Sequence, residues 1–239
     1  MENTRPYQFS KDFEIRSYQV HPNGKLSLTA LADIFQEIAW RHADSADFGR
    51  TLAEQNQSWI LSRMEILCEK LPSWGDSIKA YTAGRGVDKL FAFREFLITD
   101  PNGRTIAKAM SSWVLMNMAS KRLLRPEKVL PSALFDPTEK PETQPEKIKI
   151  IGEKISSEKV KVRYADLDLN NHVNNTSYIR WVENILMEND FNKPNFLINY
   201  LAECLLGDEV TISLWKNGDD YFVQGTVGER QVFTAKASD

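Results

Sequence analysis

The sequence is poor in residues that bind metals or form disulfides. Its 239 residues include two cysteines, Cys68 and Cys204, and three histidines, His21, His42 and His172. The cysteines lie far apart in the chain, and neither they nor the histidines show the spacing of metal ligands. Because a structural zinc site needs about four nitrogen or sulfur ligands, we expect no metal and no cofactor. We expect both cysteines to be reduced.

The sequence also lacks long apolar runs and an excess of positive charge. No run is long enough to span a bilayer, and residues 1–8 have neither an apolar signal core nor transit-peptide character. The formal net charge of −3 argues against a dedicated nucleic-acid-binding protein. We therefore expect a cytoplasmic protein that binds neither nucleic acid nor a membrane.

Two amphipathic segments predict one long helix in each half of the chain. Between Leu28 and His42 apolar residues recur at helical spacing, after a serine that can cap the first turn. We interpret His42 as a histidine favoured by the macrodipole at the helix end rather than as a catalytic residue. A second helical pattern begins near Thr176, with Asn174 or Asn175 as its N-cap.

The remaining segments alternate like strands separated by turns. We expect strands within residues 7–20, 58–69, 77–84, 90–99, 105–118, 148–164 and 195–237. Residues 136–147 are rich in proline and alternating charge, which predicts a linker rather than a packed element. The linker separates an N-terminal domain, residues 1–135, from a C-terminal domain, residues 148–239. Each domain would be α+β, with a curved antiparallel sheet wrapped around one long helix.

The segment between the linker and the second helix carries the chemistry. Asp168, Asn170 and His172 are two residues apart, so their side chains would share one face of an extended backbone. Together, these residue types can orient a reactant, donate hydrogen bonds and transfer protons. We therefore expect a catalytic strand that leads directly into the helix.

Residues 163–181, RYADLDLNNHVNNTSYIRW, strongly resemble the catalytic segment of the acyl-acyl-carrier-protein (acyl-ACP) thioesterases of plant plastids and bacteria. Further similar stretches occur in the same order: FEIRSY at 13–18, Gln36-Glu37, LPSWGD at 71–76, and SSWVLMN at 111–117 before Lys121-Arg122. The resemblance covers nearly the whole chain and implies a tandem hot-dog fold, with much of the acyl pocket in the N-terminal domain. Residues 1–8 show no likeness to the plastid-targeting region of the plant enzymes, so we expect a bacterial protein.

The resemblance implies hydrolysis of fatty acyl-ACP, which releases a free fatty acid and ends chain elongation. The partner would be the carrier protein, with the acyl chain on its phosphopantetheine arm. An acyl-CoA thioesterase on the same fold is the alternative; a hot-dog hydratase or dehydratase and a non-catalytic acyl-binding module fit less well. Hot-dog domains usually pair, so an internally paired monomer and a homodimer of such pairs are both compatible with the sequence.

The family's active residues form an Asp-x-Asn-x-His pattern followed by a Glu-Cys pair. The matching positions are Asp168, Asn170, His172, Glu203 and Cys204. In one scheme Glu203 activates water, His172 and Asn170 position the water or the acyl carbonyl, and Asp168 fixes neighbouring groups. In the other, Cys204 attacks, His172 takes its proton and Asn170 orients the imidazole. We favour Glu203, because a thioester is already activated and a thiolate would need a lowered pKa.

Two further sets of residues complete the expected site. Helix N-termini present unpaired amides, so the oxyanion donors would be the backbone N–H groups of Val173, Asn174 and Asn175. The carrier protein is acidic, and basic side chains near the entrance would steer it. The candidates are Lys121, Arg122 and Arg125, although an ordinary solvated charge run explains them as well.

Overall fold

The described part of the chain forms one antiparallel sheet with two long helices on one face. The computed structural model describes residues 5–45, 51–52, 54–130, 136, 139–189 and 195–238. The strands are β1 (Phe9–Glu14), β2 (Gln57–Cys68), β3 (Ser77–Asp88), β4 (Phe91–Thr99), β5 (Thr105–Asn117), β6 (Arg122–Leu124), β7 (Glu153–Lys161), β8 (Asn195–Tyr200), β9 (Glu209–Asn217), β10 (Asp220–Val227) and β11 (Arg230–Ser238). The helices are α1 (Leu28–Asp44) and α3 (Asn175–Met187), with short 3-10 turns at η1 (Ser17–Gln19), η2 (Pro126–Lys128) and η3 (Tyr164–Asp166).

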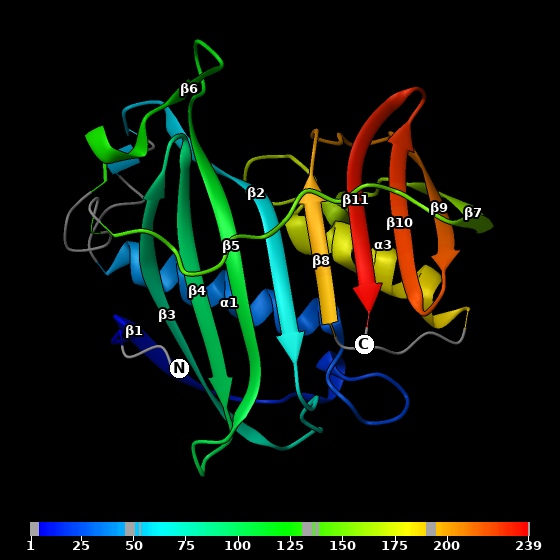
Figure 1. Cartoon of the computed structure of the whole chain (residues 1–239), viewed down its shortest axis with the longest axis horizontal. Helices are drawn as coiled ribbons and strands as arrows, with labels where there is room; N and C mark the ends of the chain where they lie inside the picture. Colours follow the sequence, from blue (N-terminus) through cyan, green and yellow to red (C-terminus); the bar gives the residue numbers. More distant parts are fainter. Residues whose placement is uncertain are drawn as a thin grey trace.

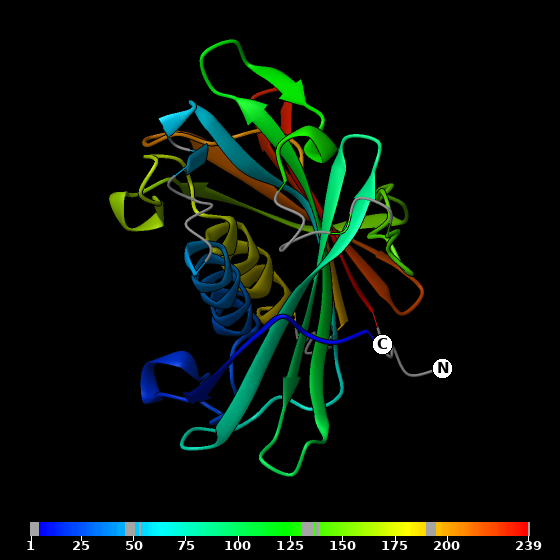
Figure 2. The ribbon, with the colours of Figure 1, turned by 90° about the vertical axis from the view of Figure 1, so that its left-hand side faces the viewer.

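The strand order shows that the two halves repeat one plan. The sheet runs β1-β3-β4-β5-β2-β8-β11-β10-β9-β7, and β6 pairs with β5 outside this path. Read from the centre outwards, both halves have the same order of strands. They meet where Arg63–Ile66 of β2 pair with Phe196–Asn199 of β8. Figures 1 and 2 show α1 and α3 side by side on one face of this twisted sheet. The predicted tandem hot-dog fold is confirmed.

Both predicted helices form, and their predicted caps are present. The Ser27 hydroxyl accepts a hydrogen bond from the Ala30 amide, and the Asn174 side chain accepts one from the Thr176 amide. The apolar stripes of α1 and α3 face the sheet and share one core. The strand predicted within residues 7–20 is shorter than expected, because the chain turns through η1 directly after β1.

Glu183 joins the two helices. Its buried carboxylate, on α3, accepts hydrogen bonds from the amides of Leu28 (2.6 Å) and Thr29 (3.1 Å) at the start of α1. The Thr29 hydroxyl (2.7 Å) and the His21 Nε2 atom (2.8 Å) also contact this carboxylate. One helix therefore supplies the anion that satisfies the free amides and the positive end of the dipole of the other.

The predicted position of His42 at the end of α1 is confirmed, but the predicted interaction of a charged imidazole with the macrodipole is wrong. His42 lies in the last turn of α1, but it is buried, and its Nδ1 atom lies 2.9 Å from Nη1 of Arg94. Arginine can only donate, so Nδ1 accepts and the imidazole is neutral. Burial and then the Arg94 charge lower the pKa of His42 to about 4. A charged imidazole favoured by the macrodipole is therefore absent near neutral pH.

The described part of the predicted linker, from residue 139 onward, crosses the face of the sheet opposite the helices (Figure 1). It has no helix or strand up to β7, but Pro145 is buried and its carbonyl accepts a hydrogen bond from Arg63 (3.0 Å). The Asn199 side chain accepts a hydrogen bond from the Ile148 amide and donates one to the Glu146 carbonyl. The described part of the segment is therefore irregular and mostly exposed, and Pro145 is the point at which it packs on the sheet. The predicted boundary at residue 135, like residues 137 and 138, lies outside the described residues.

No helix within the described ranges is both long and apolar enough to cross a membrane.

Candidate active site

The segment with Asp168, Asn170 and His172 is a tight loop, so the predicted strand is wrong. The Asp168 amide donates to the His172 carbonyl (2.8 Å), and Leu167 and Val173 form an isolated bridge. The Asp168 carboxylate accepts the amides of Asn170 (2.8 Å) and His172 (3.2 Å). An aspartate that captures amides further along its own chain folds the backbone into a turn. This turn, rather than an extended backbone, brings the polar side chains together.

A second loop of the same form precedes α1. There the His21 amide donates to the Lys25 carbonyl (2.8 Å), as Asp168 does to His172, and Val20 and Leu26 form the matching bridge. Each loop has one left-handed residue, Gly24 (φ 75°) in the first and Asn171 (φ 59°) in the second. The loop is therefore the standard entry to the helix in both halves, and only its side chains differ.

His172 and Glu203 face each other across two loops. Nε2 of His172 lies 3.6 Å from Oε2 of Glu203, and both side chains are partly exposed. The Val173 amide donates to the Cys204 carbonyl (3.2 Å), which ties the two loops together. Arg230 donates to the Glu203 carbonyl (2.6 Å) and fixes that backbone from the start of β11. A carboxylate beside an imidazole, both open to water, can accept and relay a proton.

Asn170 and Asp168 complete the polar side of the loop. The Asn170 side-chain amide donates to the second carboxylate oxygen of Asp168 (3.2 Å). With both oxygens of Asp168 engaged, this residue supports the loop, and Asn170 remains exposed next to it. The structure thus gives the turn role to Asp168 and brings His172 together with Glu203.

Cys204 lies in a different environment from Glu203. Its side chain is fully buried, and its backbone amide donates to the Tyr178 hydroxyl (3.0 Å). Burial raises the pKa of the Cys204 thiol, although a hydrogen bond from Tyr178 partly opposes this. A nucleophilic thiolate needs the opposite shift. As expected, the side chains of Glu203 and Cys204 point in different directions, the first to solvent and the second into the core. They lie in an irregular loop, however, and not in a strand.

Two of the three predicted oxyanion amides are already occupied. Val173 donates to Cys204, and Asn174 donates to the Asp166 carbonyl (2.8 Å). Asn175 is the first residue of α3, a position at which an amide has no acceptor within the helix. Of the three predicted oxyanion donors, the backbone amide of Asn175 is therefore the remaining candidate.

The corresponding positions in the N-terminal half cannot perform this chemistry. Leu26 donates to the Pro72 carbonyl (2.9 Å) as Val173 donates to Cys204, so Leu71 corresponds to Glu203 and Lys25 to His172. The Lys25 ammonium donates to the Ser73 hydroxyl (2.9 Å). Without a carboxylate or an imidazole at these positions, the duplicated loop has no acid-base pair.

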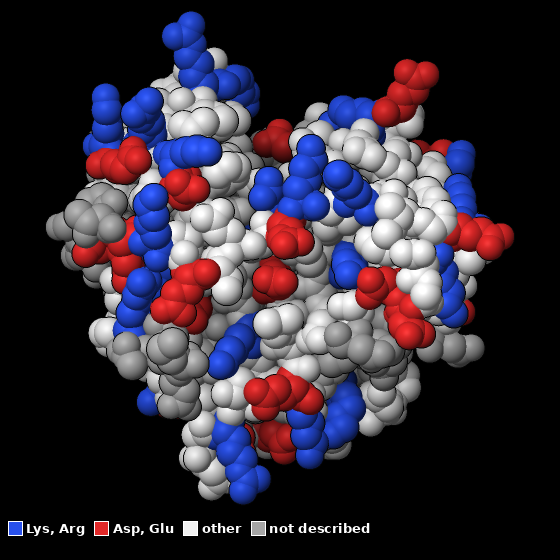
Figure 3. All heavy atoms as spheres, viewed as in Figure 1, with Lys and Arg blue, Asp and Glu red and all other residues white. Residues whose placement is uncertain are grey.

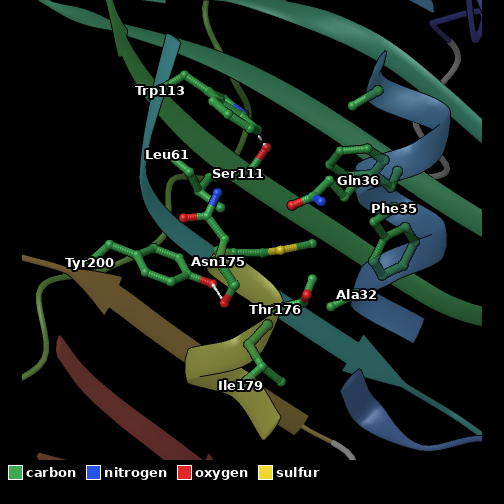
Figure 4. A pocket seen from close by; sticks show the side chains of 13 residues that line it. Ala32, Phe35, Gln36, Leu61, Ser111, Trp113, Asn175, Thr176, Ile179 and Tyr200 are labelled. Carbon is green, nitrogen blue, oxygen red and sulfur yellow. Dashed lines mark hydrogen bonds between the residues drawn. The ribbon is translucent and has the colours of Figure 1, made fainter. Parts of the chain in front are cut away.

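A narrow, largely apolar cavity lies between the helices and the centre of the sheet (Figure 4). It is lined by Ala32, Phe35, Gln36, Ala39, Leu61, Met64, Phe96, Ser111, Trp113, Asn175, Thr176, Ile179 and Tyr200. The lining thus includes the first residues of α3, directly after the catalytic loop. Its volume is about 20 Å³, which is room for about one water molecule.

The basic run lies in and beside the short strand β6. Lys121, Arg122 and Arg125 are exposed around β6. In Figure 1, β6 and the connection that leaves the end of β8 lie along the same upper edge of the sheet. Within the described part of the chain, no group of three or more His, Cys, Asp or Glu side chains is placed to hold a metal ion.

Two residues around the site were not anticipated. Arg230 fixes the backbone of Glu203, and the Tyr178 hydroxyl contacts Cys204. Tyr178 lies within the second predicted helix, but the helical pattern does not show which group its hydroxyl meets. Arg230 follows an ordinary turn and carries no motif, so no signal in the sequence pointed to it.

Comparisons with known proteins agree with this architecture. The acyl-ACP thioesterase N-terminal domain matches residues 6–131, and the acyl-ACP thioesterase C-terminal domain matches residues 151–229. The palmitoyl-acyl carrier protein thioesterase, chloroplastic, of Arabidopsis thaliana is 31% identical over 191 residues, which are 73% of this chain and 46% of the relative. Oleoyl-acyl carrier protein thioesterase 1, chloroplastic, of the same plant is 30% identical over 224 residues, 84% of this chain and 62% of the relative.

Solved structures extend the similarity to nearly the whole chain. An acyl-ACP thioesterase from Bacteroides thetaiotaomicron superposes with a TM-score of 0.82 at 25% identity, over 96% of each chain. The 12:0-ACP thioesterase from Umbellularia californica gives a TM-score of 0.85 at 25% identity, again over 96% of each chain. By contrast, this chain spans only 46% and 62% of the two plant relatives described above. Since both domain models match in order, the chain belongs to the acyl-ACP thioesterase family.

Proposed function

We propose that this protein hydrolyses the thioester of fatty acyl-ACP, releases a free fatty acid and thereby ends chain elongation. The observation that supports this proposal best is the pairing of His172 and Glu203 at 3.6 Å, next to the start of α3 and to the apolar cavity. A thioester hydrolase needs a base beside a water site, donors for the oxyanion and an apolar space for the acyl chain. The site offers a base in Glu203 and a candidate donor in the Asn175 amide, and the apolar cavity beside it marks where the acyl chain would bind once lining side chains move.

In the proposed reaction, Glu203 takes a proton from a water molecule whose oxygen attacks the acyl carbonyl carbon. His172 and Asn170 position the water or the carbonyl, and the Asn175 amide donates to the developing oxyanion. When the tetrahedral intermediate collapses, the carbon–sulfur bond breaks and the carrier's thiolate leaves. The proton held by Glu203 passes to the sulfur, directly or through His172, so that the products are a fatty acid and a free thiol.

Attack by Cys204 is the weaker scheme. A covalent route would require the thiol to lose its proton to His172, yet Cys204 is buried beneath Tyr178 with a raised pKa. Its neighbour Glu203 already lies beside the imidazole. Since thioesters react readily with an activated water molecule, the covalent intermediate is unnecessary.

The two halves would divide the work. We assign acyl-chain binding to the N-terminal domain, residues 1–135, because α1, β2, β4 and β5 supply most of the cavity lining. The C-terminal domain, residues 148–239, would supply the catalytic loops. An acyl chain cannot enter the cavity at its present volume, so substrate binding would displace lining side chains. Gln36, whose amide reaches into this space in Figure 4, is placed to move first.

The carrier protein would approach along the edge that holds the catalytic loops. Lys and Arg side chains gather over the β6 end in Figure 3, whereas charges of both signs mix over the rest of that face. Lys121, Arg122 and Arg125 would attract the acidic carrier. The cytoplasmic location and the choice between monomer and homodimer stay predictions.

The experiment that tests the proposal compares two carriers with one acyl chain. Purified protein is incubated with acyl-ACP and with the matching acyl-CoA, and thiol release is followed for each. We expect a higher kcat/KM on the carrier protein. A preference for CoA would favour an acyl-CoA thioesterase instead. Consumption of an enoyl or hydroxyacyl substrate without thiol release would indicate a hydratase or dehydratase, and carrier binding without turnover a binding module.

A further inference from the structure

An arginine is buried among the apolar side chains of the N-terminal half. Arg94, on β4, is 6% exposed, and Nη1 donates to Nδ1 of His42 (2.9 Å) and to the Thr82 hydroxyl (3.2 Å). Phe9 stacks on the His42 ring. A buried guanidinium costs stability unless it is well paired, and no step of thioester hydrolysis uses this one. Its position relative to the cavity suggests another role.

Along α1, the cavity leads to this pair. Ala32, Phe35, Gln36 and Ala39 line the cavity. In a helix, residues three or four apart lie on one face, so His42 is the next residue on this face of α1 after Ala39. The cavity lining ends at Ala39, and the imidazole that meets Arg94 lies beyond it, in the last turn of α1.

Across the sheet, the cavity leads to the same place. Its lining passes from Tyr200 on β8, through β2 and β5, to Phe96 on β4. Arg94 is two residues from Phe96 and therefore on the same face of β4. It also pairs directly with the lining residue Ser111, whose hydroxyl donates to the Arg94 carbonyl (3.2 Å). Thr82, on the neighbouring strand β3, pairs with Phe96 and accepts a hydrogen bond from Arg94.

We propose that Arg94 and His42 form the closed end of the acyl-binding channel and set the longest chain that the enzyme accepts. This inference rests on the proposed function. The terminal methyl group of an acyl chain can neither accept nor donate a hydrogen bond. A chain that pushed past Ala39 would have to separate Arg94 from its acceptors and leave a buried charge without them, which is costly. A polar pair thus limits chain length more sharply than a movable apolar side chain would.

The test removes both polar partners at once. A single change at Arg94 would leave His42 without its donor, whereas replacing both partners by apolar groups of similar shape can be nearly neutral for stability. The variant is therefore Arg94→Met with His42→Leu. Hydrolysis rates on acyl-ACP are measured over successive even-numbered chain lengths, together with binding of free fatty acids of the same lengths.

We expect the double variant to accept longer chains. The kcat/KM of the next longer substrate, relative to the wild-type optimum, should rise at least about tenfold, the effect of one or two methylenes in a fitted pocket. Fatty-acid binding should move in the same direction. Conversely, Ala39→Met fills the channel before the pair and should shift both profiles towards shorter chains.

The same strands provide a matched control on the other side of the sheet. Arg85 forms a buried ion pair with Glu95 (2.5 Å), and Glu95 alternates with Arg94 on β4, so it faces away from the helices. The control variant, Arg85→Met with Glu95→Leu, also removes a buried arginine pair. It should leave both length profiles unchanged.

Unchanged length profiles in the channel-end variant and in Ala39→Met would overturn the inference, as would an equal shift in the control. If the channel-end variant does not fold, Ala39→Met alone decides. If the wild-type protein hydrolyses no acyl-ACP, the proposed function fails, and the length dependence of fatty-acid binding still decides whether the pair closes the channel.

Discussion

Val173 donates its backbone amide to the carbonyl of Cys204 at 3.2 Å. This single bond joins the loop of His172 to the loop of Glu203, and it places the two side chains 3.6 Å apart although they are distant in sequence. The corresponding bond in the N-terminal half, from Leu26 to Pro72, joins loops without catalytic side chains. The fold therefore builds the same junction twice, and only the junction in the C-terminal half carries the proposed acid-base pair.

The duplicated loop predicts that Lys25→Met retains activity. Lys25 stands where His172 stands in the C-terminal half, but its ammonium donates a hydrogen bond to the Ser73 hydroxyl instead of meeting a carboxylate such as Glu203. We expect kcat/KM on acyl-ACP within about twofold of wild type, whereas His172→Ala should lose about a hundredfold or more. Steady-state rates of the two variants make this check. Comparable losses in both would show that the N-terminal loop takes part in catalysis.

Glu183 predicts a stability effect that exceeds that of an exposed glutamate. Glu183→Ala leaves the buried amides at the start of α1 without their acceptor, at a cost of about 2–3 kcal/mol. For a chain of this length, Tm should fall by about 4–12 °C. The control is Glu37→Ala, which breaks an exposed pair with Arg41 and should cost less than about 0.5 kcal/mol. Calorimetry of both variants compares them, and equal losses would contradict the capping role.

His42 predicts a loss of stability in acid. Its pKa is about 4 in the folded protein and about 6.5 in an unfolded chain. Between these values the unfolded state binds the additional proton, so the free energy of unfolding falls as pH decreases from about 6.5 to 4. The shift corresponds to at most about 3 kcal/mol. In His42→Gln, which keeps an acceptor for Arg94, this part of the pH dependence should disappear.

Urea unfolding of wild type and His42→Gln across this pH range provides the comparison. Because the other titrating groups are common to both proteins, the difference between the two curves isolates the histidine. Parallel curves would mean that His42 does not titrate as its burial requires.

The basic run predicts a carrier-specific effect. Charge reversal at Lys121, Arg122 and Arg125 should raise KM for acyl-ACP several-fold at low salt, with little change in kcat or in acyl-CoA hydrolysis, because exposed charges mainly steer association. Arg104→Glu, at the opposite end of β5, is the control. A KM that does not respond to the charge reversal would leave these residues as an ordinary solvated run.

The sequence predicted the two helices and most of the strands because their apolar periodicity is strong and local. It failed at the loop of the candidate active site, where the spacing of Asp168, Asn170 and His172 imitates a strand. There the Asp168 carboxylate accepts hydrogen bonds from two backbone amides, and Asn171 adopts a left-handed conformation. Neither feature can be predicted from the spacing of the residues.

The buried polar pair in the N-terminal half could not be predicted for a different reason. Arg94 and Glu95 are adjacent in a strand, so alternation alone does not say which of them faces the core. The answer depends on His42, which is far away in the sequence and belongs to a helix. Likewise, the spacing could not decide between Glu203 and Cys204, because they lie in an irregular loop whose contacts, such as that of the Cys204 amide with the Tyr178 hydroxyl, are not visible in the sequence.

The role of Glu203 can be tested most directly by measuring thiol release from acyl-ACP with Glu203→Gln and Cys204→Ala. Glu203→Gln keeps the shape of the side chain and removes the base, so we expect kcat to fall by about a hundredfold or more. Cys204→Ala removes a buried, protonated thiol and should stay within about threefold of wild type, provided that its Tm shows a folded protein. Loss of hydrolysis in Cys204→Ala, with Glu203→Gln near wild type, would contradict the account.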